Sequence, residues 1–367
     1  MTELFIGLMS GTSLDGVDGV LLAHTEEQAR VLHHAYRPFP PALAREFMVL
    51  NRSGADELHR AALAANKLAH LYAQVVQDLL QASSLSPSAI RAIGAHGQTV
   101  RHRPQEFDGT GYTVQLNNPA LLAELCGIDV VADFRSRDVA AGGQGAPLVP
   151  AFHQAWFGRC GAKLAILNLG GIANLSVLGA DVIGFDCGPG NALLDYWCQQ
   201  HTSQPFDQAG AWAAAGRVNE DLLALLRQDA YFSKPAPKST GRDLFNPQWL
   251  QDRLAVCAPM EPIDVQATLT ELTASTCADA LAGYAASCQE LVVCGGGALN
   301  SYLMGRLQDL LPQLTVNSSH AHGLPPLQVE ASAFAWLARK TLRRETASLQ
   351  SVTGAQGARI LGSIYPA

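Results

Sequence analysis

Three glycine-rich segments are the parts of this sequence best suited to holding a phosphate. They are Gly7–Asp18 (GLMSGTSLDGVD), Asn168–Asn174 (NLGGIAN) and Cys294–Asn300 (CGGGALN), and each adjoins a short apolar run. Glycine lets a backbone approach a phosphate closely, and hydroxyls and amides of such loops donate to its oxygens. The first segment lacks the Gly-Lys-Ser/Thr ending of a Walker A loop. Alone it reads equally well as a hairpin turn, but three such segments in this order predict a nucleotide site.

Two carboxylates in the first segment, Asp15 and Asp18, could hold Mg²⁺ directly or through water, because Mg²⁺ prefers hard oxygen ligands. Which residues bind the metal directly stays open. The residues that we assign to the nucleotide site are Gly11, Thr12, Ser13, Leu14, Asp15, Gly16, Val17, Asp18, Gly170, Gly171, Gly295, Gly296, Gly297 and Asn300.

Asp186 is the candidate general base. It ends the apolar run Val182–Phe185 and precedes Gly188-Pro189-Gly190, so we expect its carboxylate at the edge of a sheet. Residues at such strand ends often form active sites. The alternative is that Asp186 only caps the turn that follows. Glu330 is a second acid, at the start of the last predicted helix, where the helix dipole alone would favour it.

Two further residues are candidates for substrate binding. Arg135 comes at a strand end, and its planar guanidinium suits a carboxylate; the alternative is an ordinary ion pair with Asp133 or Asp138. Gln98 lies beside His96 in a second strand-end loop. We expect His96 to form hydrogen bonds rather than to transfer protons, although its chemistry permits both.

The elements that must position these residues form the same pattern twice. Strands are predicted at Leu4–Met9, Val17–Leu22 and Val31–Tyr36, joined too tightly for a crossover helix, which indicates the antiparallel start of a mixed sheet. A helix over about 55–81, with apolar residues at helical spacing, packs on that sheet. Strands recur at 163–167, 172–178 and 182–185.

We therefore predict an α/β protein of two similar lobes with a ligand cleft between them. The expected boundary lies near residue 160, giving lobes of residues 1–160 and 161–367. The alternative for the last helix, about 329–342, is that it returns to the first lobe. The 367 residues make two domains the natural expectation.

Composition excludes several functional classes. The formal net charge of −7 gives no general attraction to nucleic acid or to acidic membranes. The eight cysteines have irregular spacing and form no CxxC pair, which favours reduced, buried thiols over zinc or disulfides. With no signal sequence or apolar run of membrane-spanning length, we expect a cytoplasmic protein. A homodimer is the default assembly.

The order of the three glycine loops resembles that of the acetate and sugar kinase, heat-shock chaperone and actin superfamily. That resemblance implies two ribonuclease-H-like lobes with mixed five-stranded-type sheets and ATP in the cleft between the lobes. The sequence departs from the superfamily at Gly7-Leu8, where many members carry an aspartate near the start of the first phosphate loop. This departure weakens a metal assignment transferred from the wider superfamily.

A narrower resemblance covers nearly the whole chain. It is carried by Gly7–Gly16 (GLMSGTSLDG), Gly94–Thr99 (GAHGQT), Asp133–Arg135 (DFR), Ala141–Pro150 (AGGQGAPLVP), Phe185–Asn191 (FDCGPGN), Lys238–Arg242 (KSTGR) and Val293–Gly297 (VCGGG). These segments are similar to signatures of bacterial anhydro-N-acetylmuramic acid kinases.

The resemblance to that family implies a reaction and roles for residues. ATP, with Mg²⁺, would phosphorylate O6 of 1,6-anhydro-N-acetylmuramic acid while water opens the anhydro ring, giving N-acetylmuramic acid 6-phosphate and ADP for cell-wall recycling. Asp186 matches the family's catalytic aspartate, and Glu330 matches a glutamate near the sugar. The stretch around Arg135 would bind the sugar.

Two rival functions remain at this point. A kinase of an ordinary sugar would use Asp186 to deprotonate a hydroxyl without opening a ring. A sugar- or nucleotide-binding regulator would show no turnover, but such a protein usually carries a DNA-binding segment, and no basic helix-turn-helix pattern is present. Lys238–Arg242 is a candidate lid or nucleotide contact.

Overall fold

The computed structural model describes residues 2–11, 13–25, 28–158, 164–236, 238–241, 244–284 and 288–367. Two compact units make up the chain: Met1–Phe152 together with Gln328–Ala367 (unit 1), and His153–Leu327 (unit 2). The sequence predicted a boundary near residue 160, with a return of the last helix to the first lobe as an alternative. The contacts instead group residues 328–367 with unit 1.

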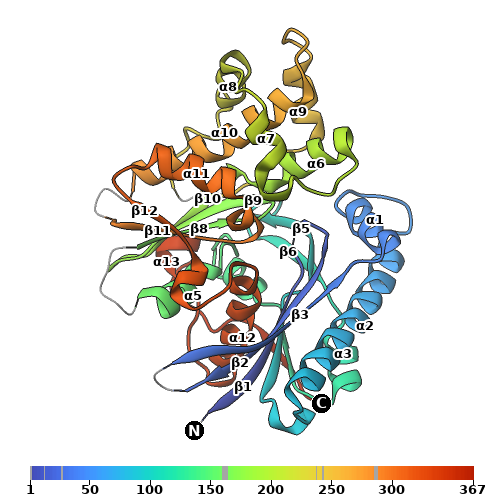
Figure 1. Cartoon of the computed structure of the whole chain (residues 1–367). Coiled ribbons are helices and arrows are strands. Elements are labelled where there is room, and N and C mark those ends of the chain that lie inside the picture. Colours follow the sequence, from blue (N-terminus) through green and yellow to red (C-terminus); the bar gives the residue numbers. More distant parts are fainter. Residues whose placement is uncertain are drawn as a thin grey trace. The chain divides into compact units, whose positions relative to one another are not determined.

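Unit 1 is built on a six-stranded sheet with the order β13-β7-β4-β1-β2-β3. Figure 1 labels its strands β1, β2 and β3. The first three strands are antiparallel, while β4 runs parallel to β1 and β7 parallel to β4. The bounds are β1 (Glu3–Met9), β2 (Gly16–His24), β3 (Ala29–Pro38), β4 (Ala92–Ala95), β7 (Val130–Ala132) and β13 (Ser363–Tyr365). The predicted strand–turn–strand start is confirmed.

Helices cover both faces of this sheet. Helix α2 (Glu57–Ser83) packs on one face, and α12 (Val329–Leu342) packs against β1, β4 and β2. The predicted bounds of the last helix are confirmed, and it packs on the first sheet. The other helices of this unit are α1 (Pro41–Leu50), α3 (Pro119–Cys126), α4 (Ser136–Val139) and α13 (Gln350–Thr353), and α5 (Val149–Phe157) runs across the division into unit 2.

Glycine explains how α12 approaches so closely. Gly7 and Gly94 are neighbours in the β1–β4 register. A Cβ on Gly7 would lie 1.9 Å from the Ala331 carbonyl oxygen, and one on Gly94 would lie 2.0 Å from that of Phe334. The absence of a side chain at Gly7 therefore serves helix packing.

Unit 2 repeats the same strand order in a five-stranded sheet, β10-β9-β8-β11-β12. Again the first three strands are antiparallel, and β11 and β12 add in parallel. The bounds are β8 (Leu164–Leu169), β9 (Ile172–Val177), β10 (Ile183–Pro189), β11 (Glu290–Cys294) and β12 (Thr315–Ser318). Because each unit has the ribonuclease-H-like strand order, the predicted fold class is confirmed; Lys163, predicted to start β8, lies outside the described residues.

One strand differs from its prediction. We expected the run to end at Asp186, but β10 continues to Pro189 across an irregularity in its pairing with β9, between Asp186 and Gly188. The glycine and proline residues that suggested a turn are therefore accommodated within the strand.

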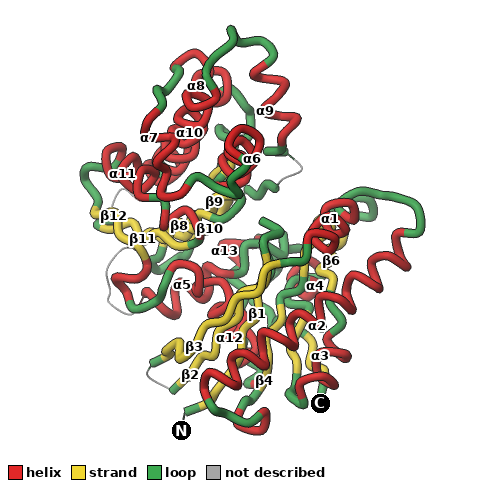
Figure 2. Tube along the Cα trace, turned by 45° about the vertical axis from the view of Figure 1, so that its right-hand side comes forward, coloured by secondary structure: helices red, strands yellow, loops and turns green. Residues whose placement is uncertain are grey.

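A layer of helices packs against the second sheet. In Figure 2 these helices are red and the strands of the sheet are yellow. Helix α10 packs against β9 and β10 and against helices α6, α7, α8 and α11. The helices are α6 (Asn191–Thr202), α7 (Ala211–Ala215), α8 (Glu220–Arg227), α9 (Pro247–Leu254), α10 (Pro262–Ala282) and α11 (Ser301–Leu310). Among the described residues of the chain, no helix is both long and apolar enough to cross a membrane.

Candidate active site

A closed ring of hydrogen bonds holds the first glycine loop in unit 1. The Gly97 amide donates to the Tyr72 hydroxyl (3.0 Å), and Ser10 Oγ donates to the Gly97 carbonyl (3.0 Å). The Tyr72 hydroxyl therefore donates to Ser10 Oγ, 3.0 Å away. Both Ser10 and Tyr72 are buried. The ring fixes the start of the loop against the His96–Gln98 stretch.

In the second half of this loop, Asp15 is the main hydrogen-bond acceptor. Asp15 Oδ1 accepts hydrogen bonds from Ser13 Oγ (2.6 Å) and from the Gly16 amide (2.9 Å). Leu14 adopts a positive φ of 59°, and its amide donates to the Gly11 carbonyl. Thr12 lies outside the described residues. Asp15 is exposed, so its carboxylate faces solvent at the end of β1.

The last two predicted loop residues belong to strand β2. Val17 is fully buried in the core. Asp18 Oδ1 lies 2.9 Å from His34 Nε2. Burial raises the pKa of Asp18, against the lowering effect of His34.

Arg135 meets His96 at the carboxyl end of β4. The Arg135 guanidinium donates to His96 Nε2 (2.9 and 3.2 Å) and to the Gly145 carbonyl (2.8 Å). His96 Nε2 is thus the acceptor, and Nδ1 donates to the Ser10 carbonyl, 3.3 Å away. Burial and the nearby Arg135 lower the pKa of His96 to about 3, so the imidazole is neutral at physiological pH. This geometry favours the hydrogen-bonding role over proton transfer.

Asp138 anchors the glycine-rich loop that Arg135 touches. The Gly145 amide and Thr353 Oγ1 donate to its two oxygens, each at 2.8 Å, and Asp138 is fully buried. The Gln144 amide donates to the Thr353 carbonyl. The C-terminal segment of the chain thereby fixes this loop in unit 1.

Gln98 and Glu330 lie near the same corner of unit 1. Gln98 is buried, and its Nε2 donates to the Gly11 carbonyl at 3.1 Å. Glu330 is in the first turn of α12, one turn before Phe334, whose ring lies 4.7 Å from the His96 ring. The structure thus brings Gln98 and, through His96, Arg135 to the first glycine loop, while Glu330 is placed only by its position at the start of α12.

In unit 2 the second glycine turn is bound to the start of α6. The Gly190 and Ala192 amides donate to the Gly171 carbonyl, and the Asn191 amide donates to that of Gly170, at 2.8–3.1 Å. A Cβ on Gly190 would lie 2.4 Å from the Gly170 carbonyl oxygen. The junction between β10 and α6 is therefore held against the Gly170-Gly171 turn.

The third glycine loop closes on the same place. A Cβ on Gly297 would lie 2.5 Å from Leu169 Cβ, and Gly295 has a φ of +78° beside Asn168. Asn191 Nδ2 donates to the Leu169 carbonyl (2.9 Å). Gly296 is exposed. Glycine-rich segments from β8, β10 and β11 thus converge at one edge of the sheet.

Asn300 follows this loop as the cap of α11. Its Oδ1 accepts a hydrogen bond from the Leu303 amide at 3.0 Å. A short 3-10 turn, Gly296–Leu299, separates the glycines from the helix. Helix α11 begins at Ser301, and the side-chain oxygen of Asn300 is used in capping it.

Asp186 is held from three directions on the edge strand β10. The Thr240 amide donates to Asp186 Oδ2 (2.9 Å), the Asp186 amide donates to the Lys238 carbonyl (3.1 Å), and the Tyr231 hydroxyl donates to the Asp186 carbonyl (2.8 Å). A hydrogen bond to the carboxylate favours its ionised form. The segment around Lys238–Arg242, whose role sequence left open, thus holds Asp186 in place, with Arg242 outside the described residues.

Charges near Asp186 are partly desolvated. Burial lowers the pKa of Lys238, while Cys187 and Asp186 act to raise it. Burial and the charge of Asp186 raise the pKa of Tyr231. A hydrogen bond with Cys277, together with burial, raises the pKa of the Cys187 thiol. The carboxylate therefore lies in a setting where electrostatic interactions are weakly screened.

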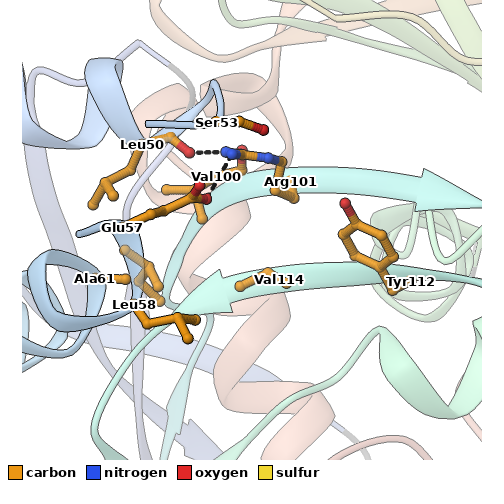
Figure 3. Close-up of a pocket in the computed structure, with 10 residues that line it drawn as sticks. Leu50, Ser53, Glu57, Leu58, Ala61, Val100, Arg101, Tyr112 and Val114 are labelled. Carbon is orange, nitrogen blue, oxygen red and sulfur yellow. Dashed lines mark hydrogen bonds and ion pairs between the residues drawn. The ribbon is translucent and has the colours of Figure 1, made fainter. Parts of the chain in front are cut away.

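The pocket drawn in Figure 3 contains none of the predicted site residues. It lies in unit 1 between α2 and the hairpin of β5 (Gln98–Pro104) and β6 (Gly111–Leu116). Its Arg101 donates to the Leu50 carbonyl and to Glu57 Oε1 (Figure 3). Because the guanidinium is occupied within the protein, we assign this pocket no role in the reaction.

Sequence reasoning missed Tyr72, Asp138 and Tyr231 as residues that position the site. Tyr72 was read only as part of an apolar helix stripe, and Asp138 only as a partner of nearby arginines. A buried hydroxyl on such a stripe needs a hydrogen-bond partner, and that requirement was the available signal.

The chain is similar to known proteins along its whole length. The sequence profile of the anhydro-N-acetylmuramic acid kinase family matches residues 3–367. The anhydro-N-acetylmuramic acid kinase of Albidiferax ferrireducens is 62% identical over 389 aligned positions, covering 100% of both proteins. That of Variovorax paradoxus is 64% identical over 372 positions, covering 100% of this chain and 99% of the relative. The chain therefore belongs to the anhydro-N-acetylmuramic acid kinase family.

Proposed function

We propose that this protein uses ATP to convert 1,6-anhydro-N-acetylmuramic acid into N-acetylmuramic acid 6-phosphate and ADP, in the recycling of cell-wall peptidoglycan. The observation that carries the proposal is the family match over residues 3–367, with relatives above 60% identity along the whole chain. The catalytic and binding residues named below are part of the proposal.

Asp186 is the general base in this proposal. It takes a proton from a water molecule, whose oxygen bonds to C1 while the bond between C1 and O6 breaks, as at an inverting glycosidase. The electron pair of that bond stays on O6, which attacks the γ-phosphorus of ATP, and ADP leaves. The Thr240 amide on Oδ2 supports this role, because it keeps the carboxylate ionised and oriented.

Arg135, Gln98 and Glu330 bind the sugar in this proposal. The lactyl group of the substrate carries a carboxylate that suits a guanidinium. Arg135 is already oriented by His96 and by the Gly145 carbonyl. A neutral His96 supports this assignment because it leaves the positive charge of Arg135 available to an anion.

The glycine loops of both units contact ATP in this proposal, through Gly11–Asp18, Gly170-Gly171 and Gly295–Gly297, with Asn300 close by. The convergence of the last two loops on one sheet edge supports it. Mg²⁺ fits the chain through few protein ligands, since in kinases it is held largely by phosphates and water. No group of three or more His, Cys, Asp or Glu residues suited to a metal occurs among the described residues. The exposed carboxylate of Asp15 would hold the ion, which neutralises charge on the phosphates.

The cellular setting follows from the substrate. A sugar recovered from the wall and phosphorylated with ATP is consumed in the cytoplasm, and we propose that location and a homodimeric state. Neither a nucleic acid nor a membrane has a part in the reaction.

The test is a reaction with 1,6-anhydro-N-acetylmuramic acid, ATP and Mg²⁺ in ¹⁸O water. We expect ¹⁸O at C1 and phosphate on O6. Asp186→Asn should lower kcat by about 10²–10⁴-fold, because a positioned base contributes that much. Asp181→Asn, at an exposed carboxyl before the same strand, is the matched control and should keep wild-type activity.

Two other outcomes would favour the rival functions, a kinase of an ordinary sugar and a regulator without turnover. Consumption of ATP only with a sugar that has a free hydroxyl would replace the coupled reaction by simple phosphorylation. Binding of sugar and ATP without any turnover would indicate a regulator.

A further inference from the structure

Asp186 lies at an irregularity in the pairing of the edge strand of the second sheet. Strand β10 is the outermost strand, and its register with β9 shifts between Asp186 and Gly188. The Asp186 amide and carbonyl are bonded to Lys238 and Tyr231, which lie outside the sheet. An edge strand presents backbone groups that need partners, and a register irregularity re-aims its side chains. The 231–240 segment supplies these partners.

The side chain of Lys238 contacts Tyr231, so it links the two residues that bond to the backbone of Asp186. Its Nζ donates to the carbonyls of Phe232 (3.1 Å) and Tyr231 (3.3 Å). The same ammonium lies 4.9 Å from the centre of the Tyr231 ring and 5.8 Å from that of Phe185. Cation–π contacts and two charge-assisted hydrogen bonds thus hold a partly desolvated ammonium in one position.

These contacts form a closed circuit, which we call the Asp186 clamp and define as Tyr231, Lys238 and Thr240. From Asp186 the circuit runs through its amide to the Lys238 carbonyl, along the Lys238 side chain to Tyr231, and through the Tyr231 hydroxyl back to the Asp186 carbonyl. The Thr240 amide, two residues beyond Lys238, reaches the carboxylate itself.

We infer that Lys238 is a positioning residue: it holds the clamp closed so that the Thr240 amide fixes the Asp186 carboxylate in its working orientation. The inference rests on the proposed role of Asp186. The Lys238 ammonium need not touch sugar or ATP. Its effect passes through the backbone of residues 238–240, and a displacement of about 1 Å at a reacting group can cost about 10²-fold in rate.

The charge of Lys238 also acts on Asp186. Three titratable groups, Lys238, Tyr231 and Cys187, have pKa values that respond to the charge of Asp186. Of the three, only Lys238 carries a positive charge at neutral pH, and a positive neighbour favours the ionised carboxylate. Removal of that charge should therefore make Asp186 easier to protonate.

The first experiment measures kcat, the KM for each substrate and the pH profile of kcat for Lys238→Met and Lys238→Arg, each shown to be folded by circular dichroism. We expect Lys238→Met to lower kcat by about 10–100-fold, to leave both KM values within about threefold, and to move the acidic limb to higher pH. Lys238→Arg keeps the charge, so its acidic limb should stay near the wild-type position. A folded Lys238→Met with wild-type kcat and an unmoved limb would overturn the inference, as would a loss confined to KM.

The second experiment uses a pair of tyrosines and does not depend on Lys238 variants folding. The Tyr284 hydroxyl accepts from the Ala236 amide at 2.9 Å, so both tyrosines hold the 231–240 segment, but Tyr231 bonds to Asp186. We expect Tyr231→Phe to lower kcat by about tenfold and Tyr284→Phe to lower it by less than twofold. Equal effects of the two variants would show that the segment matters only for structure and would overturn the inference.

Failure of the proposed function is a separate result. If wild-type protein does not turn over the anhydro sugar, or if Asp186→Asn retains full activity, the assignment of the reaction or of the base is wrong. If wild-type turns over, Asp186→Asn does not, and the Lys238 and Tyr231 variants match wild-type, only the clamp is wrong.

Discussion

The two units share one strand order but use glycine in different places. In unit 1, Gly7 and Gly94 lie side by side within the sheet, where each meets the backbone of α12. In unit 2, Gly190, Gly295 and Gly297 lie after the strands, where loops meet loops. In unit 1, glycine therefore leaves room for a helix to approach the sheet. In unit 2, glycine leaves room for three loops to converge.

This difference separates two kinds of site residue. In the proposed function, long side chains of unit 1 such as Arg135 and Gln98 bind the sugar, and the buried neutral His96 orients Arg135. In unit 2, the same proposal gives the binding of ATP mainly to the backbone of the glycine loops, with Asp186 as the general base. Substitutions of glycine should accordingly affect stability most in unit 1 and function most in unit 2.

The largest effect on stability is expected for Gly94→Ala. The new Cβ would lie 2.0 Å from the Phe334 carbonyl oxygen, and a helix backbone cannot move aside as a flexible side chain can. We expect a loss of about 3 kcal/mol in the free energy of unfolding, at the upper end for overpacking. Urea unfolding measures it. Gly54→Ala, where the nearest atom is 3.8 Å away, is the control and should change stability by less than about 0.5 kcal/mol; equal losses would remove the packing role of Gly94.

An intermediate effect on stability with a clear effect on function is expected for Gly297→Ala. The new Cβ meets the Leu169 side chain at 2.5 Å, which displaces the third loop from the second. We expect a loss of about 1–3 kcal/mol in stability and a rise in the KM for ATP of about tenfold, with the KM for the sugar changed much less. Steady-state kinetics with each substrate varied in turn measures this.

Gly305→Ala provides the matched control in α11, because a Cβ there has no neighbour within 4 Å. Helix propensity should make this variant more stable by about 0.5–1 kcal/mol, with unchanged kinetics. An unchanged KM for ATP in a folded Gly297→Ala would contradict the functional use of glycine in unit 2.

The last prediction concerns pH, through two buried histidines, His96 in unit 1 and His153 in unit 2. Burial lowers the pKa of both His96 and His153 to about 3. Between that value and the unfolded pKa of about 6.5 the unfolded chain binds more protons, so stability is present above pH 6.5 and falls as pH decreases. Between pH 7 and pH 5, the free energy of unfolding of His96→Gln should therefore fall by about 2 kcal/mol less than that of the wild-type protein. Urea unfolding at the two pH values measures the difference; identical losses would mean that His96 is protonated in the folded protein.

Regular elements were predictable where one local pattern repeats. The three opening strands of each unit follow from short apolar runs, several of them beside glycine-rich loops, and α2 and α12 follow from amphipathic helical patterns. Helix α10 was not predicted, because it is buried along much of its length with Thr268, Thr270 and Glu271 among its buried residues. Such a helix has no single apolar stripe for sequence reasoning to find.

The sequence by itself determined the family, the order of the glycine loops and the doubled strand pattern, because each is encoded in residues close together in the chain. Only the tertiary structure decided which residues form hydrogen bonds with the first glycine loop and with Asp186. Ser10 meets Tyr72 and Gly97 across separations of 62 and 87 residues, and Asp186 meets Thr240 across 54. Hydrogen bonds of this kind depend on how sheets and helices pack, and local periodicity carries no information about partners so far apart in sequence.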